Sequence, residues 1–385
     1  MNDIQQLHID RERLADTFIR LCETDSLSRK EGRMAELVTK ILYSLDAPLP
    51  FEDDSAEQTG SECGNLIFRF AGEPDREPLF FACHLDTVEP GIGIKVVRSE
   101  DDIFTSSGNT ILGCDDKSGI AAMIEVWRVI RENNLPHAPM EFIFTTCEEI
   151  GLLGAKALNP QHIRAKMGYA LDSNEFGRVV IGAPASNRLR ITVKGVAAHA
   201  GLHPETGVNA ITLAGKALAA APCGRIDEET TINFGTIQGG AASNIVPEEV
   251  VIEGEARSHS PEKLEQVTRA AEQAFRKTVE DWSDPAGTAR GVPVLNFKAE
   301  EDFPIMQLTA EDAVIRRLDQ AAERIGMELR HEVAGGGSDA NILNGYGLQT
   351  AIIATGMTNV HSTDEQIGLE DMVQLTRLLL SLVSG

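Results

Sequence analysis

Strand patterns and helix patterns alternate at both ends of this chain, and a block with a different order of elements lies between them. The run PLFFAC at 78–83 is continuously apolar, which is typical of a strand buried on both faces of a sheet. Parallel strands need helical crossovers to connect them, so the alternation predicts a mostly parallel sheet covered by helices on both faces. The expected helices are 11–23, 31–45, 116–134, 151–158, 310–325 and 369–384, and the expected strands are 65–70, 78–88, 140–149, 167–173 and 348–356.

The middle block has the order strand, helix, strand, strand, helix, strand, from about Asn187 to Glu300. This βαββαβ order is that of the ferredoxin-like α+β arrangement. We therefore expect an α/β protein in which one α/β domain, formed by residues 1–185 and 301–385, is interrupted by a ferredoxin-like domain at 186–300.

The chain carries 59 acidic residues against 35 basic ones, a net charge of −24 over 385 residues. So acidic a chain repels polyphosphates, which makes nucleic acids and anionic membrane surfaces poor partners. No run of about 18 apolar residues is present, so no membrane span is expected. The first residues lack the pattern of a secretory signal, and the six cysteines include no CxxC pair, so we expect a cytoplasmic protein with reduced thiols.

Histidine and carboxylate residues follow the predicted strands, which is where open α/β sheets bind ligands. His84 and Asp86 close the strand 78–88. Residues two apart on a strand share a face, so Asp86 can hold the imidazole of His84. A carboxylate that holds a histidine ring commonly accompanies a metal-ligating histidine.

Further candidates are expected at such strand ends: Asp115, Glu148, Glu149, Asp172 and His361. Each also has a simpler interpretation. Adjacent acids such as Asp115 and Asp116 cap helices, paired glutamates are often solvated loop residues, and a lone loop histidine is usually a surface residue. Together, however, two histidines and three carboxylates at five strand ends fit a dinuclear metal site. Zinc suits these ligands, as do manganese and cobalt.

Five ordered motifs then carry a family resemblance: HLDT, GCDDKSG, TTCEEIG, LDS and NVHS. In this order and spacing the chain resembles the M20 family of metallopeptidases over essentially its whole length, and it is most similar to the peptidase T-like branch. The resemblance implies a hydrolase that cleaves short peptides with a metal-bridging hydroxide. It also implies two divalent ions per subunit, with zinc as the first candidate.

The resemblance also implies a role for each candidate residue. His84 and Asp172 would bind one ion, Glu149 and His361 the other, and Asp115 would bridge them. Asp86 would orient His84, and Glu148 would be the general base. The peptide bond that follows the bridging aspartate is often cis in this family.

The acid at position 172 bears on the substrate. Carboxypeptidase-like and deacylase-like branches commonly have glutamate there, whereas Asp172 is similar to the aminopeptidase and dipeptidase branches. We therefore expect an aminopeptidase of tripeptides. The alternatives are a deacylase of N-acyl amino acids on the same scaffold, or a metal-stabilised dimer that only binds peptides.

Substrate-binding residues are also implied by the resemblance. In the inserted domain, His199 would reach the active site of a partner subunit of a homodimer and stabilise the oxyanion, while Asn244 and Arg257 would hold polar groups of the substrate. Near the end of the chain, Gly336 and Gly337 of the GGGSD loop would let the backbone approach the substrate closely.

Overall fold

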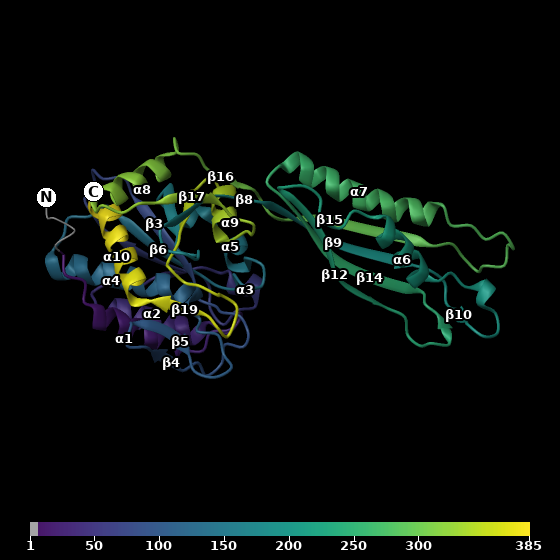
Figure 1. Ribbon diagram of the computed structural model, residues 1–385, viewed down its shortest axis with the longest axis horizontal. Helices are drawn as coiled ribbons and strands as arrows, with labels where there is room; N and C mark the ends of the chain where they lie inside the picture. Colours follow the sequence, from purple (N-terminus) through teal and green to yellow (C-terminus); the bar gives the residue numbers. More distant parts are fainter. Residues whose placement is uncertain (1–6) are drawn as a thin grey trace. The chain divides into compact units, whose positions relative to one another are not determined.

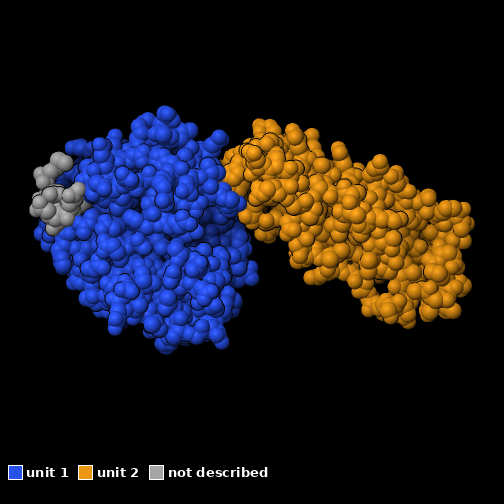
Figure 2. All heavy atoms as spheres, in the orientation of Figure 1, with its two compact units in different colours: residues 1–182, 306–385 blue, residues 183–305 orange. Residues whose placement is uncertain are grey.

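The computed structural model describes residues 7–385, which form two compact units (Figures 1 and 2). Unit 1 comprises the chain up to Gly182 and from Met306 to Gly385, and unit 2 comprises Ala183–Ile305. The sequence prediction places these boundaries at 185/186 and 300/301. The expectation about a signal sequence rests partly on Met1–Gln6, which lie outside the described residues.

Unit 1 is built on a sheet with the strand order β1-β2-β6-β3-β7-β18-β8-β16, with β17 beside β8. The central neighbours β6, β3, β7 and β18 run parallel, while β1, β2 and β8 join antiparallel to their neighbours. This confirms the predicted α/β class. The strands are β1 Phe51–Glu52, β2 Leu66–Phe70, β3 Leu79–His84, β6 Met140–Thr145, β7 Met167–Ala170, β8 Arg178–Ala183, β16 Met306–Gln307, β17 Arg330–Val333 and β18 Gln349–Ile353.

Helices cover both faces of this sheet (Figure 1). They are α1 Arg11–Cys22, α2 Gly32–Tyr43, α3 Ala56–Thr59, α4 Cys114–Asn133, α5 Leu153–Ala157, α8 Ala313–Arg324, α9 Asp339–Gly345 and α10 Leu369–Ser384. Because side chains alternate along a strand, β3 sends Phe80 to one face, into a cluster with Leu343 of α9. Its neighbour Phe81 packs against Phe142, whose ring contacts Phe70 beneath Trp127 of α4. The continuous apolar runs of the sequence therefore reflect burial on two faces.

A smaller sheet in unit 1 has no counterpart in the sequence prediction. Strand β5, Ile103–Ser106, lies between β4, Val96–Arg98, and β19, Gln366–Gly368. These strands are only three or four residues long, too short for a clear alternation of apolar residues. The pairing brings the segment before α4 beside the segment that follows His361.

Unit 2 has a sheet of order β11-β12-β14-β9-β15, with antiparallel neighbours throughout. Its main elements follow the predicted βαββαβ order. Ser260 caps α7 by accepting the N–H of Lys263, and Pro261 begins the helix. The elements are β9 Ala185–Lys194, β10 Ala198–His199, α6 Ala210–Ala220, β11 Gly224–Arg225, β12 Thr230–Gly239, β13 Ile245–Val246, β14 Glu249–Ser258, α7 Pro261–Glu280 and β15 Val294–Phe303.

The core of unit 2 lies on the helical face of its sheet. Ile191 and Ile252 point from the sheet into a buried cluster that includes Leu213 of α6 and Phe275 of α7. Between residues 7 and 385, no helix is both long and apolar enough to cross a membrane.

Candidate metal centre

His84 is the last residue of the buried strand β3 and is itself only 3% exposed. Its Nδ1 lies 2.9 Å from the backbone oxygen of Asp86 and 3.6 Å from the Oδ1 of the same residue. Because Asp86 occupies Nδ1, the ring presents Nε2 to the site, and that atom lies 3.1 Å from Oδ1 of Asp115. This is an arrangement expected for a metal-ligating histidine, whose other ring nitrogen is held here by a backbone carbonyl.

Asp115 lies in the first turn of α4, so the expectation that all the candidates stand at strand ends is wrong for this residue. The backbone before it is left-handed at Gly113, with φ 72°, and helical geometry is absent at Asp115 and Asp116. The Asp115–Asp116 peptide bond is cis, as the family resemblance implies. This irregular start directs the Asp115 carboxylate away from the helix, where it contacts two histidines.

His361 meets Asp115 and Glu149 from the loop between β18 and β19. It lies eight residues beyond β18, so it too is not at a strand end. Its Nε2 lies 3.3 Å from Oδ2 of Asp115 and 3.0 Å from Oε2 of Glu149. These two carboxylates raise the pKa of His361 to about 10. The side chains of His84, Asp115, Glu149 and His361 therefore form one contiguous group.

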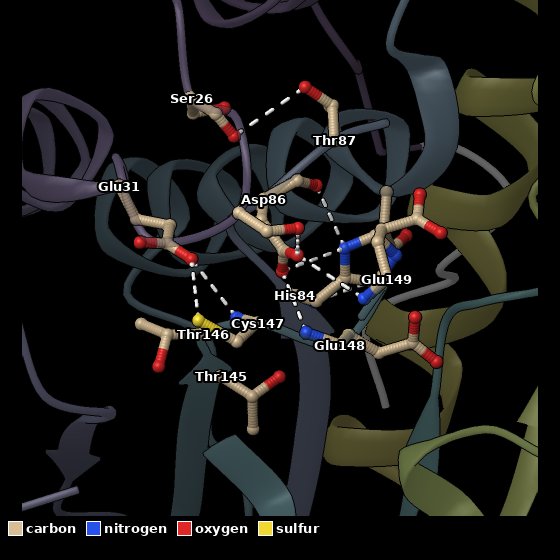
Figure 3. Close-up of polar contacts among 12 residues, drawn as sticks. Ser26, Glu31, His84, Asp86, Thr87, Thr145, Thr146, Cys147, Glu148 and Glu149 are labelled. Carbon is tan, nitrogen blue, oxygen red and sulfur yellow. Dashed lines mark hydrogen bonds and ion pairs between the residues drawn. The ribbon is translucent and has the colours of Figure 1, made fainter. Parts of the chain in front are cut away.

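Asp86 also holds the turn that carries the two glutamates. Its carboxylate accepts the backbone N–H of Glu148 at 3.0 Å and the N–H of Glu149 at 3.2 Å (Figure 3). It also accepts the hydroxyl of Ser28 at 2.6 Å. The turn begins at Cys147, two residues after the end of β6, and Cys147 has a positive φ of 54°. One buried residue thus holds His84 through its backbone oxygen and the Glu148–Glu149 turn through its carboxylate.

A second buried acid, Glu31, supports the same turn from the opposite side. Its Oε1 accepts the N–H of Cys147 at 3.0 Å and the thiol of Cys147 at 3.3 Å (Figure 3). Its Oε2 accepts the hydroxyl of Ser61. These contacts stabilise a left-handed backbone that a residue with a side chain rarely adopts.

Asp172 and Glu148 complete the acidic cluster without a direct hydrogen bond to the histidines. Burial raises the pKa of Asp172 to about 8 and raises the pKa of Glu148 well above its usual range. In both cases neighbouring carboxylates act in the same direction. Asp339, at the start of α9, accepts the hydroxyl of Thr145 at 2.5 Å, and burial raises its pKa to about 6.

The residues present fit divalent metal ions. Within the described part of the chain, ligand atoms of His84, Asp115 and Glu149 lie within 4.8 Å of one another. The surrounding carboxylates outnumber the histidines, and burial together with neighbouring carboxylates raises the pKa of Asp172 and of Glu148. Imidazole nitrogens together with carboxylate oxygens are ligands of zinc, manganese and cobalt. Two divalent cations would supply the missing charge.

The other predicted residues lie on loops and in unit 2. His199 and Asn244 are neighbours within unit 2, because Asn244 O accepts the N–H of Ala200 at 2.9 Å. Arg257 lies far along β14, where it pairs with Glu255 at 2.9 Å. Gly336 and Gly337 precede Asp339 in the loop between β17 and α9. The roles of these residues stay predictions.

The sequence prediction missed three residues that support the loops of this site. Ser28, Glu31 and Glu365 contact the loops that carry the candidate ligands. None belongs to one of the motifs at strand ends. Glu365 lies four residues after His361, close to the NVHS motif. Its distance from that motif along the chain does not indicate that its side chain is buried.

Comparisons with known proteins cover both units. Residues 65–181 match peptidase family M28, and residues 181–283 match the peptidase dimerisation domain of M20 peptidases. YqjE of Bacillus subtilis (strain 168), an uncharacterized protein, is 38% identical over 97% of this chain and 98% of its own length.

Two crystal structures are similar over nearly the whole chain. Aminopeptidase PepT from Bacillus cereus ATCC 10987 is 39% identical with a TM-score of 0.86, covering 98% of both chains. A tripeptidase from Staphylococcus aureus subsp. aureus Mu50 is 33% identical with a TM-score of 0.89, again covering 98% of both chains. The chain therefore belongs to the M20 family of peptidases and is a hydrolase, as the order of its motifs predicts.

Proposed function

We propose that this peptidase is a metal-dependent aminopeptidase that releases the N-terminal residue of short peptides, with tripeptides as its preferred substrates. The observation that carries the proposal is the contact of Asp115 with both His84 and His361, at 3.1 and 3.3 Å. One carboxylate that faces two histidines suits a bridging ligand between two ions.

The candidate ligands fall into two sets, one for each ion, and the Asp115 carboxylate belongs to both. His84 and Asp172 would hold one divalent ion, Glu149 and His361 the other, and Asp115 both. Zinc is the first candidate, and cobalt or manganese are the alternatives. When bound, such ions supply Lewis acidity for the scissile carbonyl and lower the pKa of water.

Glu148 supplies the proton transfers. Burial raises the pKa of its carboxyl well above the usual range, and a raised pKa makes a carboxylate a stronger base. Its carboxylate takes a proton from the attacking water and delivers that proton to the nitrogen of the leaving amine. Asp86 fixes the position of Glu148 through the backbone N–H of that residue.

Preference for a free N-terminus is supported by two observations. Both similar crystal structures are described as peptidases of this type, an aminopeptidase and a tripeptidase. Position 172 is aspartate, as in the aminopeptidase-like branches that the motifs resemble.

The match of residues 181–283 to a peptidase dimerisation domain supports a homodimer formed through unit 2. In such a dimer, His199 would stabilise the oxyanion in the partner's site. Asn244, Arg257, Gly336 and Gly337 would bind polar groups of the substrate, with Arg257 suited to a carboxylate by its two-pronged geometry.

Hydrolysis of a free tripeptide and of its N-acetylated form, measured side by side with zinc-loaded protein, tests the proposal. We expect the free tripeptide to be cleaved at its first peptide bond with much the higher kcat/KM. Preference for the acetylated peptide would instead establish a deacylase, and metal-dependent binding of both without cleavage would establish a peptide-binding protein.

A further inference from the structure

Glu365 is a buried acid whose side chain accepts from a single short segment of another loop. The residue is 1% exposed. Its Oε2 accepts the backbone N–H of Leu112 and of Gly113, both at 2.7 Å. Its Oε1 accepts the N–H of Asp115 at 3.1 Å and the thiol of Cys114 at 3.0 Å. All four of these partners are donors, which suits an ionised carboxylate.

The four donors belong to the segment that delivers Asp115 to the candidate metal centre. The first N–H groups of a helix have no partner within the helix, and here the start of α4 is irregular as well. Gly113 is left-handed, with φ 72°, and Asp115 has an extended ψ of 105°. The carboxylate of Glu365 supplies the acceptors that this backbone would otherwise lack.

The same residue belongs to the segment that delivers His361. The backbone N–H of Glu365 donates to the oxygen of Ser362 at 3.2 Å, which closes the turn after His361. The next residue, Gln366, begins β19 and pairs with Thr105 of β5. Glu365 therefore joins the two segments whose side chains meet where His361 lies 3.3 Å from Asp115.

We propose that Glu365 is a positioning residue, whose carboxylate sets the geometry in which Asp115 and His361 together bind metal. The inference rests on the proposed function, because it assumes that these two residues are ligands. Glu365 touches neither the metal nor the substrate in this account. Partners of this kind, which act through a ligand, typically contribute 10–100-fold to metal affinity or activity.

Glu365→Gln is the principal variant, because it keeps the shape of the side chain but places an amide N–H₂ against backbone donors. Glu365→Asp keeps the charge, but its side chain is shorter by one methylene, so the carboxylate lies farther from the donors. It serves as a second variant if the first does not fold. Glu141→Gln is the matched control. Glu141 is 4% exposed and accepts the N–H of Arg164 at 2.8 Å and of Ala165 at 2.9 Å, beside the first residues of β3 rather than beside His84.

Zinc affinity is measured by competition with a chelator, together with thermal unfolding of the metal-free proteins and kcat and KM for a tripeptide. We expect zinc affinity to fall by about 10–100-fold in Glu365→Gln, by less in Glu365→Asp, and by less than about twofold in Glu141→Gln. At saturating zinc we expect kcat to fall in Glu365→Gln while KM stays near that of the unmodified protein. Both glutamine variants are expected to lower the unfolding temperature of the metal-free protein.

Unchanged zinc affinity in the folded Glu365 variants would overturn the inference, as would an equal loss in Glu141→Gln. Failure of the proposed function has a different signature. In that case the unmodified protein itself would bind no zinc or would cleave no peptide, whatever the behaviour of the variants.

Discussion

The carboxylate of Asp86 accepts the backbone N–H of Glu148 at 3.0 Å. The same side chain accepts the N–H of Glu149, and the backbone oxygen of Asp86 lies 2.9 Å from Nδ1 of His84, so one buried residue fixes a candidate base and two candidate ligands. Loss of the Asp86 carboxylate should therefore lower activity more than loss of any one of these contacts.

Replacing Asp86 by asparagine should lower kcat by about 10–100-fold, because the amide offers a single oxygen where two backbone N–H groups and the Ser28 hydroxyl require acceptors. Steady-state hydrolysis of a tripeptide at saturating zinc measures the effect. The matched control is Asp53→Asn, since Asp53 is also buried and accepts the N–H groups of Ser55 at 3.1 Å and Asn65 at 2.8 Å. Equal losses in the two variants would show that Asp86 acts only on folding.

Removal of metal should destabilise the protein, because the buried carboxylates then lose their compensating charge. A ligand that binds only the folded state at 100 times its Kd stabilises it by about 2.7 kcal/mol. Thermal unfolding after chelation, and again after zinc is restored, is expected to show a lowered and then a recovered midpoint. Identical midpoints with and without zinc would argue against a metal centre in this cluster.

Asp339 should give the metal-free protein a measurable pH dependence. Burial raises the pKa of this carboxyl from 3.8 to about 6, so the folded chain holds the proton more tightly than the unfolded chain does. The stabilisation by the protonated Asp339 carboxyl is fully present below about pH 4 and is lost as the pH rises through about 6. The free energy of unfolding changes by roughly 3 kcal/mol between these limits.

The free energies of unfolding of the metal-free protein and of Asp339→Asn, measured between pH 4.5 and 7.5, isolate this contribution. With rising pH, the difference in stability should shift in favour of the variant, which has no ionisable group at that position. A difference that stays constant over this range would contradict the assignment.

A role for His199 in the partner's site predicts complementation between inactive variants. His199→Ala and Glu148→Ala dimers should each be inactive or nearly so. After subunits are exchanged, a mixed dimer contains one site with Glu148 intact and with His199 supplied by the other subunit. Activity should therefore return on mixing, whereas a role for His199 in its own subunit predicts no recovery.

The motifs predicted the candidate ligands because they follow strands of the sheet or open a helix beside it. His84 and Glu149 could be located from apolar runs that end in histidine or acid, and the βαββαβ order of the middle block indicated its fold. The family resemblance supplied the role of His361, which the residue pattern alone leaves as a surface histidine.

Residues such as Glu31 and Glu365 could not be found in this way. Each is one of 59 acids, and neither follows a predicted strand, because Glu31 is the first residue of an expected helix and Glu365 lies in a loop. Their burial depends on contacts with segments distant in sequence, such as Cys147 for Glu31 and Leu112 for Glu365. The short strands β4, β5 and β19 escaped prediction for a related reason, since pairing rather than composition defines them.

Peptide hydrolysis at this cluster is proposed to depend on Glu148 as the general base. The most direct test is the rate of tripeptide hydrolysis by Glu148→Ala, measured at a zinc content matched to that of the unmodified protein. A general base contributes about 100- to 10,000-fold. We expect a loss of that size with zinc binding preserved, and a near-normal rate in the zinc-loaded variant would rule out Glu148 as the general base.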